Sequence, residues 1–126
     1  MESQLWDEYS QLVDLYKFYL GLILQANIFA FGIIGAIITL LCGDASSYLT
    51  KYGLVVPFFL CVALATIFLR SKTPARELEE AISKLGTELK TKLPPHTYLL
   101  RHAILLFGVV HILIAAGLIA LFAIIS

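Results

Sequence analysis

Three stretches of the chain lack charged residues. The longest, Phe18 to Gly43, runs 26 residues without an Asp, Glu, Lys or Arg. A helix needs about 20 mostly apolar residues to cross a hydrocarbon core of roughly 30 Å, so this stretch predicts a transmembrane helix. Only 14% of the 126 residues are charged and 60% are apolar. A soluble chain of this size cannot bury three such helices, which excludes a globular soluble protein.

The sequence is also poor in residues that carry chemistry. It has two cysteines, Cys42 and Cys61, which we expect at different depths as free thiols and not as a disulfide. The GxSxG hydrolase elbow, the HExxH metal pair, the GxxxxGKS/T phosphate loop and the CxxC pair are absent from it. We therefore expect no enzyme, no metal site and no cofactor. A net charge of zero gives no reason to expect a nucleic acid polymer as partner.

The predicted fold class is an all-α integral membrane protein that forms a single membrane domain over residues 1–126. Its predicted spans are residues 18–43, 52–69 and 99–125. Residues 2–17 form an amphipathic lead-in helix that should run into the first span without a break. Residues 73–92 form a second amphipathic helix, because Thr73 and Pro74 are typical of a helix start and an apolar seam follows them. The seam comprises Leu78, Ile82, Leu85 and Leu89.

Aromatic residues of the lead-in helix suit a membrane interface. They are Trp6, Tyr9, Tyr16 and Tyr19, whose rings prefer burial while their polar tips stay wet. Two placements of this helix remain open: lying on the membrane surface, or packed into a cytosolic bundle.

Basic residues predict the orientation of the chain. Eight of the nine fall on the side that holds the N-terminus and the segment from Arg70 to Arg101, and Lys51 alone falls on the other side. The positive-inside rule then makes the N-terminus and both amphipathic segments cytoplasmic. We expect a multi-pass protein of the inner (plasma) membrane, with its C-terminus on the far side.

Small and polar residues line one face of the first predicted span. They are Gly21, Gln25, Gly32, Ala36, Thr39 and Gly43. Small residues let helix backbones approach closely in lipid, so Gly21, Gly32, Ala36 and Gly43 are candidates for close packing, as is Gly108 of the third span. Two interpretations remain open: a helix-packing face within or between subunits, or the wall of a pore.

Four polar residues within the spans need a structural reason: Gln25, Asn27, Thr39 and His111. Hydrogen-bonding side chains in a membrane are usually turned toward protein or toward a water-filled cavity. They therefore either bond between helices or line an aqueous path, where His111 would make conduction depend on pH.

A basic cluster marks the cytoplasmic edge of the predicted membrane domain. Its members are Arg70, Lys72, Arg76, Lys90, Lys92 and Arg101. Such residues contact the headgroups of anionic membrane lipids. The alternative is an anionic ligand such as a nucleotide, bound between subunits near the start of the amphipathic helix.

These features together predict a homo-oligomer, with a tetramer as the working number, that forms an ion channel gated or plugged by its cytosolic helices. Its size, three spans and cytosolic amphipathic helices resemble the membrane-channel effectors of Hailong-type anti-phage defence. That resemblance implies a channel that a nucleotide signal opens and that depolarises the membrane. The alternative is a non-conducting accessory or scaffold subunit of another membrane complex, bound through the same small-residue face.

Overall fold

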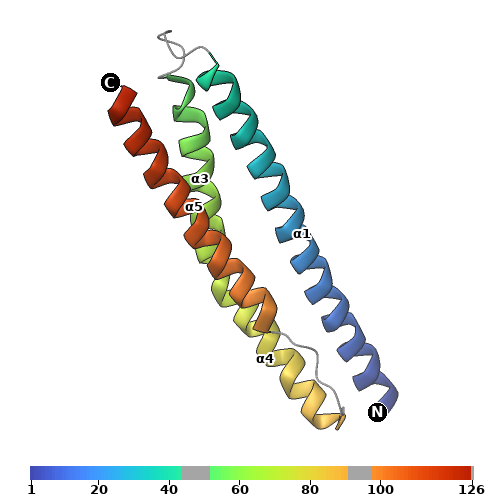
Figure 1. Ribbon diagram of the computed structural model, residues 1–126. Coiled ribbons are helices and arrows are strands. Elements are labelled where there is room, and N and C mark those ends of the chain that lie inside the picture. The colour runs from blue at the N-terminus through green and yellow to red at the C-terminus, as the bar shows by residue number, and fades with distance from the viewer. Residues whose placement is uncertain (44–51, 91–97, 126) are drawn as a thin grey trace.

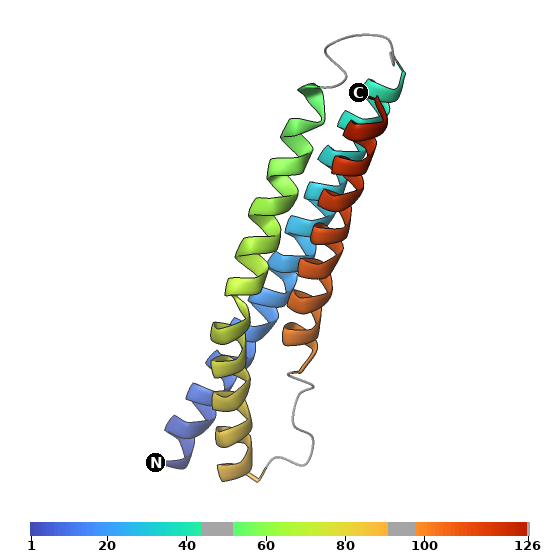
Figure 2. The same cartoon turned by 90° about the vertical axis from the view of Figure 1, so that its left-hand side faces the viewer.

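Every element in the described part of the chain is an α-helix. The computed structural model describes residues 1–43, 52–90 and 98–125, apart from the side chain of Cys42. The helices are α1 (Glu2–Cys42), α3 (Val55–Arg70), α4 (Lys72–Glu88) and α5 (Tyr98–Ile125). They lie along one another in an elongated bundle in which α1 and α5 run in the same direction and α3 with α4 runs opposite (Figures 1 and 2). The two termini therefore lie at opposite ends.

Helix α1 is a single helix of 41 residues that includes both the predicted lead-in segment and nearly all of the first predicted span. At 1.5 Å per residue it is about 60 Å long, roughly twice the thickness of a hydrocarbon core. No proline occurs before Pro57, so nothing in the sequence of α1 forces a break or a kink. Its N-terminal part extends past the start of α5 (Figure 2).

Helices α3 and α4 are nearly continuous with each other (Figure 1). At the junction, the Ser71 amide donates to the carbonyls of Ile67 and Phe68, and the Ala75 amide donates to the Ser71 carbonyl at 3.1 Å. Helix α4 therefore begins at Lys72, and the prediction that Thr73 caps it is wrong. Pro74 falls in the first turn, where a missing N–H group is tolerated.

The end of α4 also differs from the prediction. The helix ends at Glu88, four residues before the predicted end, and Lys90 adopts a left-handed backbone conformation with a φ of 51°. A residue other than glycine adopts this backbone conformation only singly and not in a run, so the helix cannot continue through Lys90. Residues 91 and 92, with which the predicted helix closes, lie outside the described part of the chain.

Three helical rods are long and apolar enough to cross a membrane: α1, α3 continued by α4, and α5. This confirms the predicted number of membrane-spanning candidates and the all-α class. Large apolar side chains on the outside of the bundle fit hydrocarbon surroundings, because water would penalise their exposure. Exposed examples are Phe18, Ile28, Phe29, Leu40, Phe59, Leu106, Leu113 and Ile124.

The interior of the bundle has two apolar clusters at different heights. The cluster nearer the N-terminus contains Tyr16, Phe68, Ala75, Ile82, Leu100 and Ile104, and the other contains Ile34, Leu54, Cys61, Ala115 and Leu118. Helices α3 and α5 share the most extensive contact, whereas α1 contacts α4 more than it contacts α3. The Cys61 thiol is buried in the second cluster and is free.

The lead-in part of α1 packs against α4 in a bundle, as in one of the two placements that its sequence left open. Tyr9, Leu12 and Val13 lie against the cluster that contains Ile82, whose side chain is only 1% exposed. The apolar seam of α4 thus packs against other helices of the same chain. An ion pair of 3.8 Å between Arg101 and Glu79 links the start of α5 to α4.

Candidate functional site

Two polar side chains lie buried between the apolar clusters. His111 on α5 is 0% exposed and Asn27 on α1 is 2% exposed. Along α1, Asn27 stands between Tyr16 and Ile34, and along α5, His111 stands between Ile104 and Ala115, so both occupy the zone between the clusters.

Aromatic rings enclose the imidazole of His111. Phe31, one turn beyond Asn27 on α1, stacks on it with ring centroids 5.4 Å apart and an interplanar angle of 12°. Phe68 of α3 contacts it at a centroid distance of 5.6 Å. Side chains of α1, α3 and α5 therefore meet at His111, which lies between the helices of the bundle.

The hydrogen bonds of the two buried side chains leave one acceptor on each. His111 Nδ1 lies 2.7 Å from the Phe107 carbonyl oxygen, which can only accept, so Nδ1 donates and the Nε2 of a neutral ring is an acceptor. Asn27 Nδ2 donates to the Ile23 carbonyl at 2.7 Å. Neither His111 Nε2 nor Asn27 Oδ1 has a hydrogen-bond partner among the described residues. The two unpartnered atoms are both hydrogen-bond acceptors.

The other two predicted polar residues, Gln25 and Thr39, face outward. Both are exposed on α1, and the Thr39 hydroxyl donates to the Gly35 carbonyl at 2.8 Å. This bond satisfies the hydroxyl proton and leaves the oxygen lone pairs on the surface of the helix. The structure therefore separates the four residues into an inner pair and an outer pair.

The small residues predicted for close packing are also divided by the structure. A Cβ atom placed on Gly21 or Gly32 meets no other atom within 4 Å, and Ala36 and Gly43 are exposed. Gly108 instead lies against α3, where an added Cβ would stand 3.4 Å from Leu69 Cδ2. The α1 stripe thus lies on the helix face opposite to Tyr16, Asn27 and Ile34, away from the other described helices.

Some members of the basic cluster form ion pairs and others do not. Arg76 forms an ion pair of 2.8 Å with Glu80, and Arg101 pairs with Glu79. Arg70, Lys72 and Lys90 are exposed and form no ion pair with the described residues. Lys92 lies outside the described residues. At the α3–α4 junction the Ser71 and Ala75 amides are bonded to preceding carbonyls, so few free N–H groups remain there for an anion.

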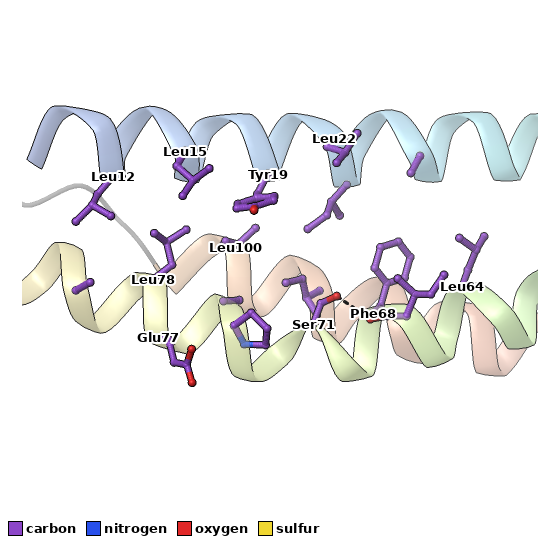
Figure 3. Close-up of a pocket in the computed structure, with 17 residues that line it drawn as sticks. Leu12, Leu15, Tyr19, Leu22, Leu64, Phe68, Ser71, Glu77, Leu78 and Leu100 are labelled. Carbon is purple, nitrogen blue, oxygen red and sulfur yellow. Dashed lines mark hydrogen bonds between the residues drawn. The ribbon is translucent and has the colours of Figure 1, made fainter. Parts of the chain in front are cut away.

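A long apolar cavity of about 750 Å³ separates the N-terminal half of α1 from α3 and α4. Leu12, Leu15 and Tyr19 project into it from α1, and Leu64, Phe68 and Leu78 face them from the opposite wall (Figure 3). Leu100 and Ile104 of α5 close its back. Of the 17 lining residues, only Tyr19, Ser71 and Glu77 carry polar side chains.

Tyr16 has a structural role that sequence reasoning missed. It was predicted for the membrane interface, but it is 6% exposed, and its hydroxyl accepts a 3.2 Å hydrogen bond from the Leu100 amide. Leu100 is the third residue of α5, where amides lack a partner within their own helix. Burial raises the pKa of the Tyr16 phenol, the Leu100 bond lowers it by less, and the charge of Glu79 adds to the rise. Its place in the Leu5, Tyr9, Leu12, Tyr16 pattern was the available signal.

Comparison with protein-family models, with curated proteins and with solved structures finds no match to this chain. Within residues 1–43, 52–90 and 98–125, no three His, Cys, Asp or Glu side chains come together as a metal site. The arrangement of the helices and of their polar and small residues must therefore carry the functional argument.

Proposed function

We propose that the chain is an integral membrane protein whose copies assemble through the outer face of α1 and conduct ions along the axis between them. The observation that carries this proposal is the position of the small and polar stripe. Gly21, Gln25, Gly32, Ala36 and Thr39 lie on the side of α1 that faces away from the rest of the protomer. Such a face favours close approach of a second helix in lipid, where apolar burial gives no drive for association.

The sealed interior of the protomer supports a pore between subunits. A path through a single protomer would have to pass Asn27 and His111, which are both buried, and the rings of Phe31 and Phe68 pack on the imidazole of His111. Gln25 and Thr39 are exposed polar residues of the predicted first span, and their amide and hydroxyl oxygens are suited to replace part of the hydration shell of a cation. We assign the pore wall to this face.

The charged ends of the helices support the proposed orientation and gate. Helix α4 and the first part of α1 lie at the end of the bundle opposite to the C-terminus (Figure 1). All the basic residues in the described ranges belong to this half of the molecule, which the positive-inside rule places in the cytoplasm. Because α4 continues α3 almost without a break, a movement of the cytosolic end is transmitted to the spanning part. An effector of anti-phage defence would use such a gate to depolarise the inner membrane when a nucleotide binds at the exposed basic residues.

The proposal is tested by the current across planar bilayers that contain the purified protein, together with its oligomer mass in detergent. We expect discrete current steps from a defined oligomer. Thr39→Val should reduce the unitary conductance, because it removes an outward oxygen at constant volume. Thr66→Val is a matched control, since the Thr66 hydroxyl donates to the Val62 carbonyl at the same 2.8 Å but lies on α3.

Two further variants separate assembly from conduction. Gly32→Leu should weaken the oligomer with little effect on the stability of the protomer, because a Cβ atom placed on Gly32 meets no other atom within 4 Å. Gln25→Leu should lower conductance and leave the oligomer mass unchanged. A monomer without current would contradict the pore and favour the accessory-subunit alternative, in which the same face of α1 binds a different membrane protein.

A further inference from the structure

We infer that the cavity between α1 and the α3–α4 rod is a binding site for an anionic phospholipid, with one acyl chain inside it and the phosphate at Arg70. The inference rests on the membrane placement proposed above and is independent of ion conduction. It gives the long apolar cavity an occupant with a defined chemistry.

The dimensions of the cavity fit a hydrocarbon chain. It has a volume of about 750 Å³, and its α1 wall extends from Leu12 to Ala26. At 1.5 Å per residue this wall is about 21 Å long, whereas one leaflet of a hydrocarbon core is about 15 Å deep. Arg70 lies six residues from Leu64 at the deep end of the opposite wall, so about 9 Å of an acyl chain joined to a phosphate there lies inside the cavity and the rest continues into the leaflet.

The polarity of the lining changes along the length of the cavity. Its deep half, toward Ala26 and Leu64, is lined only by apolar side chains. Tyr19 and Ser71 lie near the predicted membrane edge, and Glu77 lies further toward the cytosolic end, where it projects away from α1 (Figure 3). Apolar side chains also line the cytosolic part of the cavity, so Tyr19 and Ser71 mark a polar level between two apolar parts, at which a headgroup would lie.

The charges beside the cavity select the headgroup. Arg70 is not itself a lining residue, but it follows the lining residue Ile67 by three positions and precedes Pro74 by four, so it lies at the flank of the cavity. It is exposed and has no ion-pair partner in the described ranges, in contrast to Arg76 and Arg101. An unpaired guanidinium at the cytoplasmic membrane edge is a bidentate donor for a phosphate group.

Access from the membrane requires no rearrangement of the bundle. Lipid can enter from the side, because the apolar side chains at Leu22 and Ile67 are exposed at the edges of the cavity. Leaving this volume empty in a bilayer would forfeit the dispersion contacts that an acyl chain makes with the walls. The site therefore competes for lipids of the surrounding leaflet and selects among them by headgroup.

The experiment is native mass spectrometry of the full chain released from nanodiscs of phosphatidylglycerol and phosphatidylcholine in equal amounts. We expect about one retained phospholipid per protomer, with phosphatidylglycerol enriched several-fold. Ala26→Leu and Ala26→Phe fill the deep end by increasing amounts, so retention should fall in that order. Ala116→Phe adds the same ring on the exposed face of α5 and should retain lipid as the parent does.

Arg70→Gln separates the headgroup from the chain. It should keep one lipid per protomer but lose the preference for phosphatidylglycerol, whereas Arg76→Gln, at an ion-paired arginine on another face, should keep the preference. Protein that carries no lipid, or equal retention in the Ala26→Phe and Ala116→Phe variants, would overturn the inference. An oligomer that dissociates in Ala26→Phe while the parent carries no lipid would identify a second copy of the chain as the occupant. Extraction of the parent from membranes by alkaline carbonate would instead overturn the membrane placement.

Discussion

Replacing Tyr16 by Phe tests how α5 is fixed to α1. The substitution keeps the buried ring and removes only the hydroxyl that accepts the Leu100 amide. A buried amide without its acceptor costs about 1–3 kcal/mol, and the 3.2 Å length of this bond places it at the weak end of the geometric range. We therefore expect Tyr16→Phe to lower the free energy of unfolding by about 1–2 kcal/mol, which is roughly a 5- to 30-fold change in the unfolding equilibrium.

Two measurements test this expectation. Unfolding in mixed detergent micelles gives the loss of stability, and hydrogen exchange gives the opening of one amide, because the Leu100 N–H should exchange faster in Tyr16→Phe. Tyr19→Phe is the control: Tyr19 is exposed on the same helix, so its effect should stay within about 0.5 kcal/mol. Unchanged stability together with unchanged Leu100 exchange would refute the role assigned to the Tyr16 hydroxyl.

The same side chain predicts a loss of stability at alkaline pH. Burial raises the pKa of Tyr16 above its ordinary value of about 10, so the unfolded chain loses the phenolic proton at a lower pH than the folded chain. The stabilising contribution is complete below about pH 10 and is lost as the pH rises from there through the higher pKa of the folded state. Unfolding measured across this range should show a smaller pH dependence in Tyr16→Phe than in the parent. Equal pH dependence in the two proteins would contradict this account.

Two more substitutions probe the interior. Ile82→Ala should lower the free energy of unfolding by about 2–5 kcal/mol, because Ile82 is 1% exposed. Leu85→Ala on the same helix should lower it by less, because Leu85 is only partly buried. Equal losses in chemical unfolding would contradict this difference in burial. His111→Phe should change stability by less than about 1.5 kcal/mol, because it removes the unpartnered Nε2 together with the Nδ1–H that donates to the Phe107 carbonyl, and keeps a ring against Phe31. A larger destabilisation in thermal unfolding would contradict this account of the imidazole.

Residue patterns that repeat along a helix were sufficient to predict the elements. The absence of proline before Pro57 and the long uncharged run after Lys17 predict a single continuous first helix, and α1 has this form. The boundary between the second span and α4 was misplaced because Thr73 and Pro74 resemble a helix start. In the structure, the amides of Ser71 and Ala75 already bond to carbonyls of the preceding turn. The Thr73 side chain therefore has no free amides to cap at this point.

The candidate polar and small residues were predicted as a set, but their division into inward and outward residues was not. Helical spacing placed Gln25, Thr39 and the small residues on one face, and it could not say whether that face points inward or outward. The structure turns it outward because Tyr16, Asn27, Ile34 and their neighbours fill the inner face of α1. Spacing within one helix contains no information about which side meets another helix, unless one side is clearly more polar.

The sequence by itself determined the class of protein, the number of helices that can cross a membrane and the end at which the positive charge collects. These follow from run length, hydropathy and charge position, which act along the chain and need no partner segment. Only the tertiary structure decided that Tyr16 binds the Leu100 amide, that Phe31 covers His111, and that a cavity remains between α1 and α4. Each of these joins residues tens of positions apart, and such pairings depend on how rigid helices of different lengths fit side by side.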